Sequence, residues 1–95
     1  MRVSFHPDAE IELAAAQDWY QERSPLASIG FLREISSAIL RIQEAPLRYP
    51  LTEPGTRRLN LERFPFTVHY RVSEGVILVV AVAHQRRRPR YWAKR

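Results

Sequence analysis

The sequence contains no cysteine, only three glycines and no long hydrophobic run, and each absence excludes a class of protein. Without cysteine there is no disulfide framework, no thiolate nucleophile and no cysteine-based metal site, which favours a cytoplasmic protein. The longest apolar run, Val76 to Ala83, has eight residues, far below the ~20 that a membrane helix needs, so no membrane contact is expected. No glycine-rich phosphate loop, serine elbow or acidic dyad is present, and the three histidines lack ligand spacing. Neither a metal nor a cofactor is expected.

Positive charge is what the sequence has in excess, and it is concentrated in the second half. Residues 51–95 hold ten basic and three acidic side chains, a net charge of +7, whereas residues 1–50 hold five basic and seven acidic ones. Six of the last ten residues are cationic and none is acidic. A chain of 95 residues is long enough for one domain, residues 1–95, and too short for two. The composition therefore predicts one small domain with an anionic partner.

Helical periodicity dominates the first half of the chain. Pro7 and the acidic residues after it predict a helix over about residues 7–23. Ser24 caps a second helix that extends to about Ala45, where Pro46 stops it, so two antiparallel helices are expected. The apolar stripe expected on the first helix is Ile11, Ala14, Ala15 and Trp19, widened by Leu13, Ala16 and Tyr20, with Trp19 and Tyr20 as core and rim.

Alternating patterns replace the helical period after a proline-rich loop expected over residues 47–56. Two alternating runs and the continuous apolar run at residues 76–83 predict a three-stranded antiparallel meander. The continuous run is typical of a central strand or one covered on both faces. With a short N-terminal strand, the predicted fold is α+β with the order β-α-α-β-β-β. A helix hairpin packs on one face of a small antiparallel sheet, and a basic C-terminal segment follows.

Two helices can cover only one face of this sheet, so the other face is expected to be partly open.

A metal-free nuclease would need a base, an acid and cations around the phosphate. His69 and His84 could act as the acid or base, because the imidazole side chain ordinarily titrates near neutral pH. For a lone histidine on a sheet face, an ordinary hydrogen-bonded or solvated role is the more common one. The alternation places on the open face Arg58, Asn60, Thr67, His69 and Arg71, with His84 near the same end and Tyr91 in the tail.

The tail from Gln85 to Arg95 interleaves guanidinium groups with two aromatic rings, Tyr91 and Trp92. This mixture suits phosphate backbones combined with base stacking, or a negatively charged protein groove. A solvated C-terminus is the alternative, which two large aromatics at a chain end make less favourable.

Two motifs resemble the RelE/ParE superfamily of bacterial toxins, in its plasmid-stabilisation, ParE-like branch. They are RFPF-x-V-x-YRV at residues 63–72 and AVAH-x-RR-x-P-x-YW at residues 81–92, and the likeness covers nearly the whole chain. The resemblance implies a toxin of a type II toxin-antitoxin pair, neutralised by a cognate acidic antitoxin. RelE-like members cleave mRNA in the ribosome, whereas ParE-like members inhibit DNA gyrase without being nucleases.

The nuclease residues of RelE-like members are only partly matched. Arg58 and Tyr91 match two of the nuclease positions. Three other positions where the nuclease pattern has cations hold Asn60, Thr67 and Gln85. Shifting the alignment by one residue at the last of these positions would place Arg86 there instead. Gyrase inhibition without catalysis is therefore the first hypothesis. A ribosome-dependent mRNA endonuclease using Arg58, His69, His84 and Tyr91 is the second, and a non-toxic nucleic-acid-binding domain the third. The residues expected to bind gyrase or its DNA complex are Arg86, Arg87, Arg88, Arg90, Tyr91, Trp92 and Arg95, and those expected to bind the antitoxin are Arg58 and Arg71.

Overall fold

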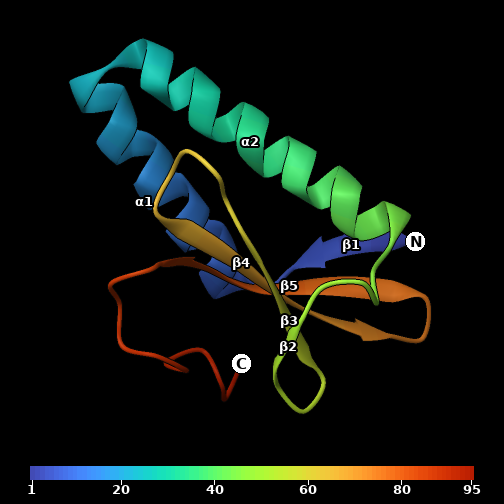
Figure 1. Cartoon of the computed structure of the whole chain (residues 1–95). Coiled ribbons are helices and arrows are strands. Elements are labelled where there is room, and N and C mark those ends of the chain that lie inside the picture. Colours follow the sequence, from blue (N-terminus) through green and yellow to red (C-terminus); the bar gives the residue numbers. More distant parts are fainter.

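The computed structural model describes residues 1–95 and has two layers, a helix hairpin on one face of a five-stranded sheet (Figure 1). The strand order is β1-β5-β4-β3-β2, with β1 parallel to β5 and the other neighbours antiparallel. The predicted α+β class is confirmed. The elements are β1 (Arg2–Phe5), α1 (Pro7–Arg23), α2 (Pro25–Glu44), β2 (Leu51–Glu53), β3 (Thr56–Asn60), β4 (Phe66–Ser73) and β5 (Val76–His84).

Each helix begins with a proline that follows a side-chain cap; the two prolines and the Ser24 cap agree with the prediction, whereas the His6 cap was not predicted. His6 Nδ1 accepts a hydrogen bond from the Asp8 amide at 3.1 Å, and Ser24 Oγ accepts one from the Ala27 amide at 3.3 Å. Proline fits the first turn because its missing N–H group has no intrahelical partner there. Neither helix is long and apolar enough to cross a membrane.

The buried face of α1 differs from the predicted stripe. Ile11 and Trp19 are 66% and 51% exposed, so Trp19 is not a core residue. Ala14 and Ala15 of that stripe are exposed too, whereas Ala16 is buried as predicted. Ala9, outside the stripe, is buried as well. Glu12 faces the sheet, where its carboxylate accepts a hydrogen bond from the Val82 amide at 3.1 Å. The last residue pair between β1 and β5 is Phe5 with Val79, so the Val82 amide has no partner on β1. A buried amide needs a hydrogen-bond acceptor, and the Glu12 carboxylate supplies one. The helix thus turns Glu12, and not Ile11 or Trp19, toward the sheet.

The sheet differs from the prediction in two details. A short strand, β2, forms inside the expected loop and pairs with β3, and Gly55 permits the tight turn between them because its φ is +77°. The sheet is mixed, because the helix hairpin returns the chain so that β5 pairs with β1 in parallel. The other expected pairings, β3 with β4 and β4 with β5, are observed.

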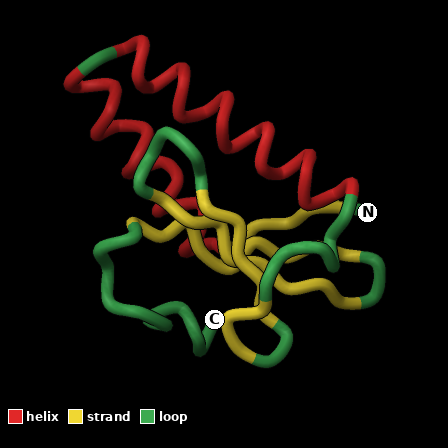
Figure 2. Tube along the Cα trace, viewed as in Figure 1, coloured by secondary structure: helices red, strands yellow, loops and turns green.

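Both faces of β5 are buried. The main core lies between the helices and the sheet, and a smaller cluster on the opposite face joins Val80, Ala81 and Ala83 to Trp92. The C-terminal segment, residues 85–95, therefore covers part of the face that was expected to be open. Figure 2 shows it as a loop that turns back beside the sheet. The main core includes Phe31, Ile35, Ala38 and Ile42 of α2 with Val68, Tyr70, Ile77, Val79 and Val82 of the sheet.

Candidate functional site

Trp92 fixes the C-terminal segment to the sheet. Its side chain is only 2% exposed, and its ring stacks on His69 of β4 with a centroid distance of 4.4 Å. The backbone is tied as well, because the Gln85 amide donates to the Pro65 carbonyl at 2.8 Å. The basic segment is therefore an ordered part of the fold.

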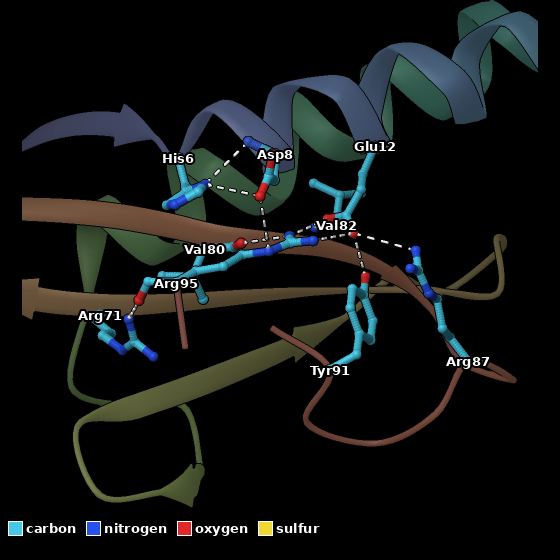
Figure 3. A network of polar contacts seen from close by, with 9 residues as sticks. All are labelled: His6, Asp8, Glu12, Arg71, Val80, Val82, Arg87, Tyr91 and Arg95. Atoms are coloured by element: carbon cyan, nitrogen blue, oxygen red, sulfur yellow. Dashed lines mark hydrogen bonds and ion pairs between the residues drawn. The ribbon is translucent and has the colours of Figure 1, made fainter. Parts of the chain in front are cut away.

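A buried carboxylate of α1 holds the end of this segment, in a group that we call the Glu12 clasp: Glu12, Tyr91 and Arg95 (Figure 3). The Tyr91 hydroxyl donates to Glu12 Oε2 at 2.6 Å. Arg95 donates through both terminal nitrogens, to Oε1 at 2.9 Å and Oε2 at 3.1 Å. Paired N–H···O contacts of this kind are strong and directional. The clasp joins the first helix to the last residue of the chain.

The clasp sets the protonation of its members. Burial alone raises the pKa of Glu12, but hydrogen bonds from Arg95, Tyr91 and the Val82 amide outweigh it and leave that pKa below its ordinary value. Burial and the hydrogen bond to Glu12 raise the pKa of Tyr91. The Tyr91 hydroxyl therefore keeps its proton and gives its hydrogen bond to a carboxylate.

Two further arginines support the segment from outside the clasp. Arg71 of β4 donates to the Arg95 carbonyl and, through Nε, to Thr56 Oγ1 at 3.0 Å. The Arg87 guanidinium lies 3.8 Å above the Tyr91 ring and 3.5 Å from Glu12 Oε2. Arg71 is thus turned toward the C-terminal end of the chain.

A basic cavity of about 530 Å³ lies between the C-terminal segment and the sheet. Arg90 is paired with Glu53 at 2.8 Å, but the guanidinium groups of Arg58 and Arg88 form no hydrogen bond or ion pair. No acidic side chain lines the cavity, so its potential is positive. The lining contains Thr52, Arg58, Asn60, Thr67, His69, Ala83, His84, Gln85, Arg87, Arg88, Pro89, Arg90, Tyr91 and Trp92.

His69 and Tyr91 of the cavity are not poised to transfer a proton near pH 7. Burial, followed by the charge of Arg58, lowers the pKa of His69 to about 4, so its ring is neutral at pH 7. His84 Nδ1 accepts the Arg86 amide at 3.1 Å. Because the Tyr91 hydroxyl is held by Glu12, the cavity offers cations and neutral hydrogen-bonding groups to a ligand.

A second, apolar cleft of about 440 Å³ runs beside α1. The half-exposed Trp19 lines it, and the Arg23 guanidinium lies 3.8 Å from the centre of the Trp19 ring. Its other lining residues are Glu12, Ala15, Ala16, Tyr20, Pro65, Phe66, Val82, His84 and Arg87.

The structure brings together most of the residues that the sequence singled out. Arg58, His69, His84 and Tyr91 all line the basic cavity, together with Arg87, Arg88, Arg90 and Trp92. Arg86 lies outside it and is exposed. Arg71 and Arg95 are bonded within the protein. Sequence reasoning missed Glu12, because its acidic neighbours on α1 carry the same pattern and face solvent. No group of three or more His, Asp or Glu side chains is arranged to hold a metal ion.

Comparisons with known proteins agree with this architecture. Residues 3–89 match the family described as ParE toxin of type II toxin-antitoxin system, parDE. A solved structure titled "Chromosomal ParDE TA system from P. aeruginosa" superposes with a TM-score of 0.76 at 25% sequence identity, covering 88% of this chain and 95% of that chain. No curated protein sequence matches. Because the family match extends over most of the sequence, the chain belongs to the ParE toxin family of the RelE/ParE superfamily.

Proposed function

We propose that this ParE-family toxin inhibits DNA gyrase by binding gyrase or its DNA complex through the C-terminal segment. The observation that carries the proposal is the Glu12 clasp, which holds a strongly cationic segment in one conformation on the sheet. An ordered segment loses less conformational entropy on binding than a solvated tail does. Since gyrase acts on chromosomal DNA, the proposal places the toxin in the cytoplasm.

The arrangement of the site favours a binding inhibitor over a nuclease. General acid–base cleavage needs a group that can release or take up a proton near pH 7. The Tyr91 hydroxyl is bonded to Glu12, and the neutral His69 ring is stacked on Trp92. Asn60 and Thr67, which stand where the nuclease pattern has cations, are hydrogen-bonded to each other at 2.6 Å.

The proposed target-binding residues divide into two groups. Arg86 and Arg88 are exposed and form no ion pair, so we assign them direct contacts with the target. Arg87 and Arg90 are more than half exposed and can add to those contacts. Three proposed residues act from within the fold by holding the segment in place: Tyr91, Trp92 and Arg95.

A cognate acidic antitoxin completes the proposal. The chain carries a net charge of +5, which favours an acidic partner. The apolar cleft beside α1 offers such a partner a protein-like surface. Arg58 is free to contact the antitoxin, whereas Arg71 is engaged with the Arg95 carbonyl. The printed title of the superposed structure, a ParDE toxin-antitoxin system, supports the pairing by analogy.

Gyrase supercoiling with purified toxin tests the target. Inhibition by the wild-type chain should weaken when Arg86 and Arg88 are both changed to Gln, and should persist in Arg33→Gln, which removes one exposed charge from α2. Unaffected supercoiling at high toxin excess would remove the gyrase target.

The second candidate is a ribosome-dependent mRNA endonuclease, which the meeting of Arg58, His84 and Tyr91 at one cavity keeps open. Primer extension on transcripts after induction decides this question. Codon-positioned cleavage that is lost in Tyr91→Phe and His84→Ala would establish the nuclease, and uncut transcripts would remove it. Normal growth on expression without an antitoxin would favour the third candidate, a non-toxic nucleic-acid-binding domain.

A further inference from the structure

The cations of the basic cavity are arranged for a ligand that the protein itself does not supply. Four arginines line the cavity, and no carboxylate does. Arg90 is neutralised by Glu53, and Arg87 is partly engaged by Glu12 at 3.5 Å. Arg58 on β3 and Arg88 in the C-terminal segment approach from different walls and have no anionic partner. An anion in the cavity would therefore meet at least two uncompensated guanidinium groups.

The chemistry of the lining favours a phosphodiester over a protein carboxylate. Interfaces with proteins have an apolar centre, whereas interfaces with nucleic acids are polar and strongly positive. The apolar or aromatic residues of the lining are Ala83, Pro89, Tyr91 and Trp92, and Trp92 is almost completely buried. The planar guanidinium fork also matches two phosphate oxygens.

The aromatic rings of the segment are not free to stack on bases. Trp92 is buried against His69. The Tyr91 ring has the Arg87 guanidinium at 3.8 Å and the Arg95 guanidinium at 5.1 Å from its centre. Base stacking, which the sequence composition suggested, has no exposed platform here, so contacts with the phosphate backbone are what the cavity offers.

We infer that the basic cavity is a binding site for the phosphodiester backbone of nucleic acid, without recognition of base sequence. The site uses Arg58 and Arg88 as its free cations, with Arg87 in support. In the proposed function this backbone is the DNA of the gyrase complex. Only that last assignment rests on the proposed function.

Fluorescence anisotropy with labelled mixed-sequence oligonucleotides tests the inference. The probes are single- and double-stranded DNA and RNA of 20 nucleotides, titrated with the full chain at 50 and 200 mM salt. Two to three phosphate contacts predict that duplex DNA binds about 10- to 40-fold more weakly at the higher salt. Two probes of unrelated sequence should bind equally, and the four arms identify which nucleic acid binds best.

Arg58→Gln and Arg88→Gln are the matched variants, with Arg33→Gln on the outer face of α2 as the control of equal charge. Each cavity variant should lose about three- to tenfold in affinity at 50 mM salt and reduce the salt slope by about one. The control should change affinity less than twofold, and all three side chains are exposed, which leaves the core intact. Equal losses in the cavity variants and the control would overturn the inference.

Two further results separate this inference from the proposed function. A polyglutamate peptide that displaces the oligonucleotide at lower concentration than unlabelled DNA would assign the cavity to an acidic protein and overturn the phosphodiester site. Gyrase inhibition without oligonucleotide binding would also overturn it and leave the proposed function standing. Oligonucleotide binding without gyrase inhibition would keep the site and remove gyrase as the target.

Discussion

Replacement of Glu12 by Gln should loosen the C-terminal segment and leave the helix hairpin folded. The substitution keeps the length of the side chain and an acceptor oxygen for the Val82 amide. It removes the nearer of the two negative charges that pair with Arg95, leaving Asp8 at 3.7 Å, and places an NH₂ group against donors from Tyr91 and Arg95. The free energy that holds the segment on the sheet should therefore fall.

The size of this effect follows from the burial of the pair. The Glu12 and Arg95 side chains are 11% and 15% exposed. Removing one partner of a fully buried ion pair costs about 3–5 kcal/mol, and a single hydrogen bond to a charged group contributes about 1.5–3 kcal/mol. Because both side chains keep some contact with water and Gln still accepts one hydrogen bond, we expect a loss of about 2–3 kcal/mol. That loss corresponds to a factor of about 30–150 in the opening equilibrium of the segment.

Native-state hydrogen exchange measures this opening directly. The Ala93 and Arg95 amides donate to the Arg90 and Trp92 carbonyls, so their protection reports the closed segment. In Glu12→Gln their protection should fall by the factor given above. The matched control is Glu10→Gln, an exposed acid on the same helix. Equal protection in the two variants would refute the clasp.

Three further changes test other parts of the structure. Trp92→Ala should lower the free energy of unfolding by about 3–5 kcal/mol in urea denaturation, and a loss below 1 kcal/mol would show that the indole is not a core group. NMR titration should give His69 a pKa of about 4; since the unfolded chain gains a proton at this residue between pH 6.5 and 4, stability should decrease as the pH falls through that range. An equal decrease in His69→Gln would contradict this assignment. Tyr91→Phe should cost about 1.5–3 kcal/mol in the same urea assay through the lost hydrogen bond to the Glu12 carboxylate, and unchanged stability would show that this bond contributes little.

The local features of the fold could be predicted from the sequence because they depend on neighbouring residues. A proline marks the start of each helix and Ser24 marks the cap of the second, and the apolar run at residues 76–83 indicates a central strand or one covered on both faces. The helices cover one face of that strand, and Trp92 covers the other. The resemblance to ParE-like toxins had placed Trp92 in the target-binding segment. The sequence pattern left open whether the strand is central or covered on both faces, and the structure shows that Trp92 covers its second face.

The features that could not be predicted depend on contacts between distant parts of the chain. Nothing in the spacing of the acidic residues on α1 distinguishes Glu12 from Glu10 or Asp18, because its partners lie about seventy or more residues away. Glu12 faces the sheet where these partners lie, and the apolar stripe containing Ile11 and Trp19 was wrongly assigned to the core. The sequence also does not distinguish the arginines of the tail that form ion pairs from those that form none.

Titration of gyrase supercoiling with this toxin is the most direct test of the account, with transcripts assayed for cleavage in parallel. A binding inhibitor should block supercoiling only when its concentration reaches or exceeds that of gyrase, and Glu12→Gln should shift the titration to higher concentration while transcripts remain intact. Supercoiling that continues at large toxin excess while transcripts are cut would contradict the account.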